Sequence, residues 1–491
     1  MRPPTRLALL VAAAAVLAFS PALAFGFVYD DAWTIVDNEW LDRPLAELVG
    51  LLMSGEALAR KVPDATRPAM VLSLWLDRRL FGVSPVGPHL TSLLLYGATA
   101  FVVTRLALRL SGRAVVAAVA GAFFALAPLH AEPVAAVNYR EDLLSALGVG
   151  TAWLLLLERG KETSTRLALA TGALAVALLA KESSVVVVPL VGASLWLVPR
   201  FRHVVRRRPA TLFALGVALV VWALWRVPLL VQGDDIPTAP ARAPADLVLR
   251  TLRYEVEAVK HAALPFFWSP DRFRQAAPGL GVLVPFAAVM AALVVLARRR
   301  ATRTAALGVA IALLAPLGSS PLLRPVNELA DRYFFLGVLG GGLFWGFVLD
   351  EWQRRRTLPV PRAALALACL PMLVPAYLAT RIWRDERSVW TAAVERTPTS
   401  TRALAALSRV ERMAGNRARA AELVERALTL DPRYSPALVT RIYNELDEGE
   451  LERARAHLAE LAALGAADAR GVKKARRCAA LEPDAAKACI R

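Results

Sequence analysis

Four short stretches of the chain combine acidic and basic side chains in a way that suits catalysis. Each stretch borders a long apolar run. Adjacent carboxylates, as in the first stretch, offer a general base or a clamp for a divalent cation. The four sets are Asp30 with Asp31; His130 and Glu132 with Arg140, Glu141 and Asp142; Lys181 with Glu182; and Asn327 and Glu328 with Asp331 and Arg332.

The composition excludes an ordinary soluble enzyme. Of 491 residues, 56% are hydrophobic and 20% are charged, and the mean hydropathy is +0.45. Soluble proteins carry about 25% charged residues. The net charge is +18, but the basic residues gather between apolar runs, which is typical of membrane proteins rather than of nucleic-acid binding. We therefore expect an all-α polytopic membrane protein with no nucleic-acid partner.

Eleven apolar runs are candidate transmembrane helices, because a span needs about 20 predominantly apolar residues. The runs cover residues 7–28, 88–110, 114–130, 141–157, 166–180, 184–199, 210–231, 279–297, 304–320, 334–349 and 363–380.

The basic residues predict the orientation of these runs. With the N-terminus in the cytoplasm, six basic clusters holding 21 Lys or Arg fall inside, whereas the short outer segments hold only Arg140, Lys181, Arg324 and Arg332. This asymmetry follows the positive-inside rule. The first run also fits a cleavable signal peptide. Either interpretation places residue 30 onward outside.

This topology puts all four polar stretches on the outer face. Each has a simpler alternative: Asp30 and Asp31 end a helix, Lys181 and Glu182 form a turn, Arg332 anchors at the interface, and His130 packs near a helix end. An ionisable group exposed to lipid costs up to about 3 kcal/mol. Acids in four short loops of one face therefore predict a shared aqueous cavity, which is the candidate site.

Two outer stretches are amphipathic. Residues 67–81 and 244–264 each place apolar residues beside charged ones, which suits helices lying in the membrane interface. The aromatic residues near them are typical interface anchors. The alternative is that these helices form the wall or lid of a groove facing the lipid.

The C-terminal part, residues 382–491, has a different composition and a measurable period. Pro398 and Pro432 lie 34 residues apart, as do Gly415 and Gly449, and Ala420 and Ala454. This period is typical of tetratricopeptide (TPR) repeats, although a chance pair of helical hairpins is the alternative. We expect a TPR-like helical domain outside the cytoplasm. The transmembrane domain covers residues 1–381, with outer loops at 29–87, 131–142, 232–278 and 321–333.

Three cysteines are too few for a disulfide framework or a cysteine-based zinc site. Cys478 and Cys489 lie eleven residues apart on the face predicted to be exported, where a disulfide between them is expected and two free thiols are the alternative. Cys369 lies in an apolar run and is expected to serve packing.

An ordered set of motifs resembles the transmembrane-and-TPR O-mannosyltransferase family over about residues 26–465. The matching residues are Tyr29 to Asn38, Arg67 and Pro68 before Leu74 to Leu76, Leu129 to Val134, Arg140 to Leu144, Ala180 to Ser183, and Asn327 to Tyr333.

The resemblance implies a glycosyltransferase of the GT-C superfamily, which moves a sugar from a polyprenyl-phosphate carrier to an acceptor outside the cytoplasm. The Ala- and Arg-rich composition and the few repeats suggest a bacterial relative in the inner membrane. The identity of the sugar and that of the acceptor, whether protein Ser/Thr or glycan, are therefore not inferred from the family. The TPR module is a candidate acceptor-binding region.

Within this resemblance the residues receive expected roles. Asp30 or Asp31 is the general base, and a divalent cation such as Mg²⁺ or Mn²⁺ on this pair is left open. The cations Arg140, Lys181 and Arg332 stabilise the phosphate. Supporting residues are His130, Glu132, Glu141, Asp142, Glu182, Glu328 and Asp331.

Two rival functions remain at this stage. The first is a transferase that modifies envelope polysaccharide or lipid. The second is a transporter or a membrane scaffold that recruits a partner through its exported repeats. A transporter predicts paired inverted repeats and broken helices, and the sequence shows neither. A scaffold predicts that neutralising the outer acids has no effect.

Overall fold

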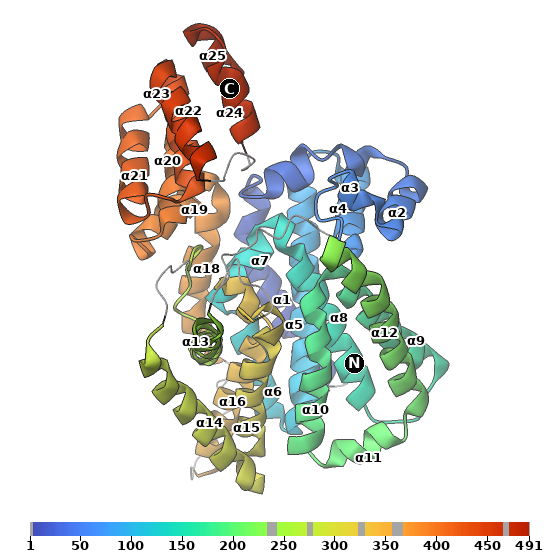
Figure 1. Ribbon diagram of the computed structural model, residues 1–491. Helices are drawn as coiled ribbons and strands as arrows, with labels where there is room; N and C mark the ends of the chain where they lie inside the picture. The colour runs from blue at the N-terminus through green and yellow to red at the C-terminus, as the bar shows by residue number, and fades with distance from the viewer. Residues whose placement is uncertain are drawn as a thin grey trace. The chain divides into compact units, whose positions relative to one another are not determined.

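The computed structural model describes residues 3–232, 243–272, 278–322, 329–355, 367–464 and 471–490. Within these ranges every regular element is a helix (Figure 1), so the predicted all-α class is confirmed. The chain divides into two compact units. The first contains Met1–Trp268 and Ala276–Arg384, and the second contains Ser269–Gln275 and Asp385–Arg491.

The first unit is a bundle of long helices joined by short 3-10 turns. Its α-helices are α1 (Pro3–Phe19), α2 (Leu45–Ser54), α3 (Glu56–Ala59), α4 (Pro68–Phe81), α5 (Val86–Ser111), α6 (Ala114–Ala125), α7 (Ala131–Ala135), α8 (Arg140–Leu157), α9 (Ser164–Ala180), α10 (Val187–Leu197), α11 (Arg200–Arg206), α12 (Pro209–Gln232), α13 (Pro244–Ala263), α14 (Leu283–Arg298), α15 (Arg303–Leu314), α16 (Val338–Arg354) and α18 (Leu373–Arg381).

Five helical segments of the described residues are long and apolar enough to cross a bilayer, so the chain is a multi-pass membrane protein. A sixth forms if α6 and the segment Pro128–Ala135, which bend by 48°, count as one span. The eleven predicted spans exceed this number. Several of them, such as α9 and α10, are helices of fewer than 18 residues, and the run at 363–380 lies partly outside the described residues. The five segments are Thr5–Ala24, Val86–Ser111, Pro209–Leu229, Leu280–Arg298 and Arg300–Ser319.

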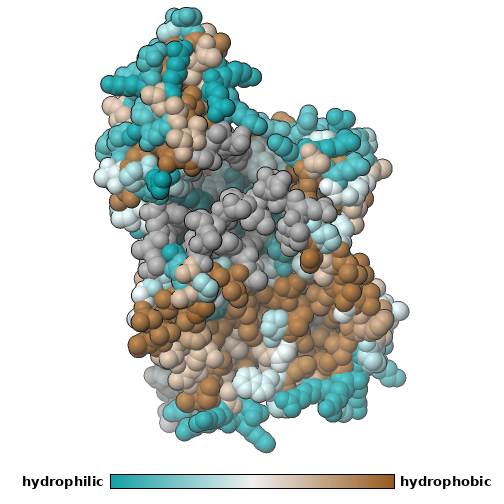
Figure 2. All heavy atoms as spheres, viewed as in Figure 1, coloured by the Kyte–Doolittle hydropathy of each residue, from teal (hydrophilic) through white to brown (hydrophobic). Residues whose placement is uncertain are grey.

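Hydrophobic side chains cover much of the face of the first unit seen in Figure 2, and hydrophilic side chains border this band at its lower rim. On α14, Val284 and Val295 are 73% and 57% exposed. In water such a surface would be unstable, whereas hydrocarbon accommodates it.

Three of the predicted basic clusters meet at one end of this bundle. Arg200 donates a hydrogen bond of 2.9 Å to the carbonyl of Leu110 at the end of α5. Arg208 donates one of 3.0 Å to the carbonyl of Leu156 at the end of α8. Cationic side chains near helix C-termini stabilise the free carbonyl groups there. The clusters around residues 105–113, 159–166 and 200–208 therefore belong to one polar rim.

The segment between α1 and α5 folds on its own small apolar core. Leu41, Leu48, Met70 and Leu74 are almost fully buried in it. The predicted amphipathic helices over 67–81 and 244–264 are present as α4 and α13. Because α4 packs on this core, its N-cap residue Arg67 is held at a defined position.

The second unit consists of helical hairpins, namely α19 (Glu386–Arg396), α20 (Thr401–Met413), α21 (Arg417–Leu430), α22 (Ser435–Glu448), α23 (Leu451–Ala463), α24 (Val472–Ala479) and α25 (Pro483–Ile490). The starts of α20 and α22 lie 34 residues apart, as do those of α21 and α23. Gly415 and Gly449 turn the chain at equivalent points with φ of 83° and 87°, a conformation that favours glycine. The helix boundaries thus follow the period seen in the sequence.

The disulfide expected from the sequence joins α24 to α25. Cys478 and Cys489 are bonded, with their Cα atoms 5.5 Å apart. Cys369 is a buried free thiol. The bond closes a short loop at the end of the second unit and thereby restricts the unfolded chain.

Candidate active site

A polar pocket of about 160 Å³ lies in the first unit, where the turn after α1 meets the start of α8. Segments from five different parts of the chain contribute to it. Among the predicted site residues, Asp30, Glu141, Lys181 and Arg332 line it. The complete lining is Tyr29, Asp30, Trp33, Thr34, Asp64, Arg67, Asn138, Tyr139, Glu141, Lys181, Arg332 and Tyr333.

The backbone around Asp30 is strained. Tyr29 has φ of 60° and Asp64 has φ of 52°, and both line the pocket. Of the residues that the structure describes, only these two and Lys61 are non-glycine residues with positive φ. Each such residue costs about 1–3 kcal/mol and persists where the surroundings hold it, commonly at functional sites. Two of these three residues therefore lie at the pocket, one of them directly before Asp30.

Asp31 lies beside Asp30 but outside the pocket lining. It is fully buried, and its carboxylate accepts hydrogen bonds from the backbone N–H groups of Val28 (3.1 Å) and Asn138 (2.7 Å). Burial raises the pKa of Asp31 to about 7, although the backbone hydrogen bonds oppose the shift. One oxygen of Asp31 bonds to the turn that carries Asp30, and the other bonds to the segment before α8. Asp31 thereby connects these two segments of backbone.

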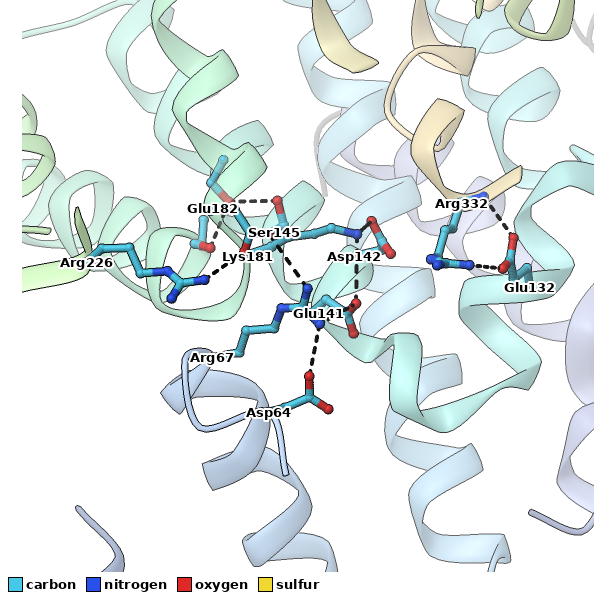
Figure 3. A network of polar contacts seen from close by, with 12 residues as sticks. Asp64, Arg67, Glu132, Glu141, Asp142, Ser145, Lys181, Glu182, Arg226 and Arg332 are labelled. Carbon is cyan, nitrogen blue, oxygen red and sulfur yellow. Dashed lines mark hydrogen bonds and ion pairs between the residues drawn. The ribbon is translucent and has the colours of Figure 1, made fainter. Parts of the chain in front are cut away.

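Arg67 stands at the centre of the charged network in Figure 3. Its guanidinium lies 3.0 Å from Asp64 and 3.3 Å from Glu141. A third carboxylate, that of Glu182, lies 3.7 Å away. Three acids thus surround one arginine, which stays charged and keeps the carboxylates in place.

Lys181 and Arg226 extend the same network. Lys181 is 2% exposed and pairs with Asp142, while Glu141 lies 3.8 Å from its ammonium. Arg226 of α12 lies 3.6 Å from the other oxygen of Glu182. Buried ions are stable only when they are paired in this way. The predicted residues Glu141, Asp142, Lys181 and Glu182 therefore form one cluster at the pocket.

Arg332 closes the pocket from the turn before α16. It pairs with Glu132 of α7, whose second oxygen accepts a hydrogen bond of 3.0 Å from the Arg332 backbone N–H. The guanidinium carbon also lies 3.9 Å from the ring centroid of Tyr139. Arginine has the flat geometry for both contacts. Asp331 is buried nearby, and Glu328 lies outside the described residues.

Besides Asp31, two predicted residues, Arg140 and His130, lie away from the lining. Arg140 is fully buried, 2.6 Å from Asp77, and donates a hydrogen bond of 2.8 Å to the carbonyl of Pro88. His130 lies 2.9 Å from the Tyr96 hydroxyl and 3.2 Å from the carbonyl of Phe335. These contacts join helices to one another and match the packing alternative for His130, while the phosphate-binding role of Arg140 stays a prediction.

The described residues do not fit the two-carboxylate metal clamp left open for Asp30 and Asp31. Both oxygens of Asp31 accept backbone hydrogen bonds. In the described ranges, no three His, Cys, Asp or Glu side chains gather closely enough to hold a metal ion. We therefore assign no metal to this pair.

Sequence reasoning missed Arg67, Asp64, Asn138 and Tyr139 as parts of the site. Arg67 was visible only as the residue before Pro68 at the start of an amphipathic helix. A proline at the first helical turn marks the preceding residue as the N-cap, but the direction of the Arg67 side chain is set by its acidic partners. Asp64 and Tyr139 carry no comparable signal.

The chain is similar in sequence to known proteins. It is 35% identical over 132 residues to "Protein O-mannosyl-transferase Tmtc1" of Drosophila melanogaster. It is 31% identical over 153 residues to TMTC1 of Mus musculus and 30% identical over 175 residues to TMTC3 of Homo sapiens, which carry the same description. This chain is similar in sequence to the protein O-mannosyl-transferases. The resemblance predicted from the motifs is confirmed.

The similarity is limited in extent. The matches cover 26%, 29% and 34% of this chain but 15%, 16% and 19% of the three relatives, so it spans less than a fifth of their length. No protein-family model matches the chain. The solved structure of ArnT from Cupriavidus metallidurans bound to undecaprenyl phosphate aligns with 90% of this chain and 79% of that chain, at 17% identity and a TM-score of 0.37.

Proposed function

We propose that the protein is a GT-C-type membrane glycosyltransferase that uses a polyprenyl-phosphate sugar as donor. The observation that carries the proposal is the pocket in which Asp30 shares a lining with three cations, Arg67, Lys181 and Arg332. A transfer from a phosphate-linked sugar needs a base on one side of the anomeric carbon and positive charge at the leaving oxygen. The sequence similarity to named transferases supports the same class.

In this mechanism Asp30 takes the proton of the acceptor hydroxyl. The acceptor oxygen then forms a bond to the anomeric carbon, and the bond from that carbon to the phosphate oxygen breaks with its electron pair. A base positioned in this way contributes about 10²–10⁴-fold to the rate. Asp31 keeps Asp30 in place and takes no part in the proton transfer.

The leaving phosphate carries charge that the three cations stabilise. Arg332 and Arg67 have the planar geometry for two hydrogen bonds to phosphate, whereas Lys181 acts as a compact charge. Their existing carboxylate partners hold them before the donor binds, so little reorganisation is needed in the transition state. The cavity of about 160 Å³ has room for the reacting groups rather than for the whole donor.

We place the pocket and the C-terminal TPR-like domain, residues 382–491, outside the cytoplasm of a bacterial inner membrane, with the basic rim inside. The excess of Lys and Arg in the predicted inner segments supports this orientation. The acceptor is a hydroxyl of a protein Ser/Thr or of an envelope glycan, and the TPR-like domain is the proposed acceptor-binding region.

The test is in vitro transfer by the purified chain from a panel of polyprenyl-phosphate sugars, with and without a chelator. We expect one donor to be consumed, and Asp30→Asn to lower its turnover by about 10²–10⁴-fold. Asp37→Asn, an exposed aspartate of the same segment, is the matched control and should retain full activity. Unchanged transfer in the Asp30→Asn variant would refute the assignment of the base, and the absence of transfer from every donor would favour a scaffold.

A further inference from the structure

An apolar groove of about 480 Å³ opens between α10, α13, α14 and α15 in the first unit, apart from the polar pocket. Its walls are formed by side chains such as Trp196, Phe286, Met290 and Leu313. Among the lining residues, Glu255 of α13 is the single ionisable one. A groove of this size and lining is typical of a site for an apolar ligand.

The groove is continuous with the lipid-facing surface. Trp196 is 58% exposed and Met290 is 37% exposed at its walls. The span Leu280–Arg298, which carries Met290, is only 6% buried inside the protein. The hydrophobic band in Figure 2 includes the face on which α10, α14 and α15 lie. The ligand that has access to this groove is therefore a lipid of the bilayer.

Glu255 is an unusual residue to find in such a groove. It is only 6% exposed, and neither carboxyl oxygen has a hydrogen-bond partner within the described residues. The neighbouring residues Tyr254 and Ala258 pack on Tyr333 and Phe334 of the turn before α16. Those contacts fix the rotation of α13, and Glu255 lines the groove.

Burial raises the pKa of Glu255 to about 8, so the carboxyl carries a proton at neutral pH. A protonated carboxyl donates one hydrogen bond and accepts others. A buried polar group that has no hydrogen-bond partner destabilises the folded chain, so a ligand that supplies a partner is favoured. The groove thus combines an apolar wall with one hydrogen-bond donor that the protein does not use.

We propose that this groove binds a glycerolipid. Its acyl chains lie against α10, α14 and α15, and one of its ester carbonyls accepts a hydrogen bond from the protonated carboxyl of Glu255. Ester carbonyls are uncharged acceptors attached directly to hydrocarbon, which matches the donor and the walls together. The hydrocarbon tail of a polyprenyl phosphate has no hydrogen-bond acceptor, so a tail in this groove would leave Glu255 without a partner. The site is separate from the pocket proposed for transfer, and it does not depend on that function.

The ligand-side test uses two phospholipids with the same head group and chain lengths, one with ester links and one with ether links. The purified full chain is equilibrated with an equal mixture in nanodiscs, and the retained lipid is measured by native mass spectrometry. One hydrogen bond of about 0.5–1.5 kcal/mol corresponds to a preference of about 2- to 13-fold for the ester lipid. Equal retention of the two lipids would overturn the proposal.

The protein-side test removes the donor. Glu255→Leu should abolish the preference for the ester lipid, whereas Glu255→Gln, whose amide also donates, should retain most of it. Glu257→Gln is the matched control on the same helix, since Glu257 pairs with Lys260 and His261 and does not line the groove. A preference that persists in Glu255→Leu would refute the role of this carboxyl. Displacement of the ester lipid by polyprenyl phosphate in the unmodified chain would assign the groove to the carrier instead.

Discussion

The carboxylate of Asp31 lies 2.7 Å from the backbone nitrogen of Asn138, a residue 107 positions later in the chain. Its other oxygen accepts a hydrogen bond from the N–H of Val28. Asp31 therefore connects the turn that carries Asp30 to the segment that leads into α8. The two adjacent aspartates thus differ in position: Asp30 lines the pocket, and Asp31 bonds to the backbone next to it.

Asp31→Asn should lower stability more than Asp30→Asn does. The asparagine amide presents a donor to one of the two backbone N–H groups, so one buried hydrogen bond is lost, at about 0.5–1.5 kcal/mol. Thermal unfolding of the purified variants in one detergent measures the difference. Asp31→Asn should also lose transfer activity, because Asp30 is no longer held. A stable Asp31→Asn protein with full activity would show that the connection is dispensable.

Arg332→Lys should lower transfer at least tenfold with little change in folding. Lysine keeps the charge and can pair with Glu132, but it cannot lie flat over Tyr139 while it presents two donors to phosphate. The kcat/KM for the donor measures the effect. Arg303→Lys, at the first residue of α15 and outside the pocket lining, is the control. Equal kcat/KM in wild type and Arg332→Lys would mean that only the charge matters at this position.

Much of the site followed from the sequence because membrane topology is a strong constraint. The excess of Lys and Arg in alternate segments placed Asp30, Glu141, Lys181 and Arg332 on one side before any contact was known, and all four line the pocket. The same reasoning could not predict that Lys181 lines the pocket whereas Arg140 lies outside its lining. That distinction depends on Asp77, whose position against Arg140 follows from the packing of α4 on α5 and α8.

The number of membrane spans depends on more than hydropathy. A run such as Ser164–Ala180 has the same hydropathy whether neighbouring helices or lipid surround it, and it carries both buried residues such as Leu174 and exposed ones such as Leu169. A run of 17 residues is near the lower limit for a span, so hydropathy alone does not distinguish the two cases. The role of Asp31 was hidden in the same way, since its partners are backbone groups that carry no sequence signal.

Arg67→Gln should lower both donor affinity and stability, because three carboxylates would lose the cation that they share. Removing this cation leaves Asp64, Glu141 and Glu182 without their shared partner, and like charges at short range repel. We expect lower donor affinity and a loss of about 3–5 kcal/mol in stability, the usual result of removing one partner from a buried ion pair. Arg60→Gln is the matched control because its pair with Glu56 is exposed. Thermal unfolding and donor titration should show a loss in Arg67→Gln and little change in Arg60→Gln.

Glu255 should make stability fall as the pH rises. Its pKa is about 8 in the folded chain, against an ordinary value of 4.5. Between these values the folded chain holds a proton that the unfolded chain has released, so the free energy of unfolding decreases as pH rises through this window. The melting temperature of Glu255→Gln relative to wild type should therefore increase from pH 5 to pH 9. A difference that stays constant with pH would contradict the raised pKa.

The cysteines provide a test of topology that is independent of activity. The bond between Cys478 and Cys489 forms and persists where the compartment is oxidising, which is the outer side of a bacterial inner membrane. Chain isolated from that membrane, denatured without reductant and treated with a maleimide, should label at Cys369 alone. Labelling of all three cysteines would place the second unit in the reducing cytoplasm and reverse the proposed orientation. The Cys478→Ser/Cys489→Ser variant should also expose α24 and α25 to protease earlier than wild type, because closing a loop of this size contributes about 3 kcal/mol.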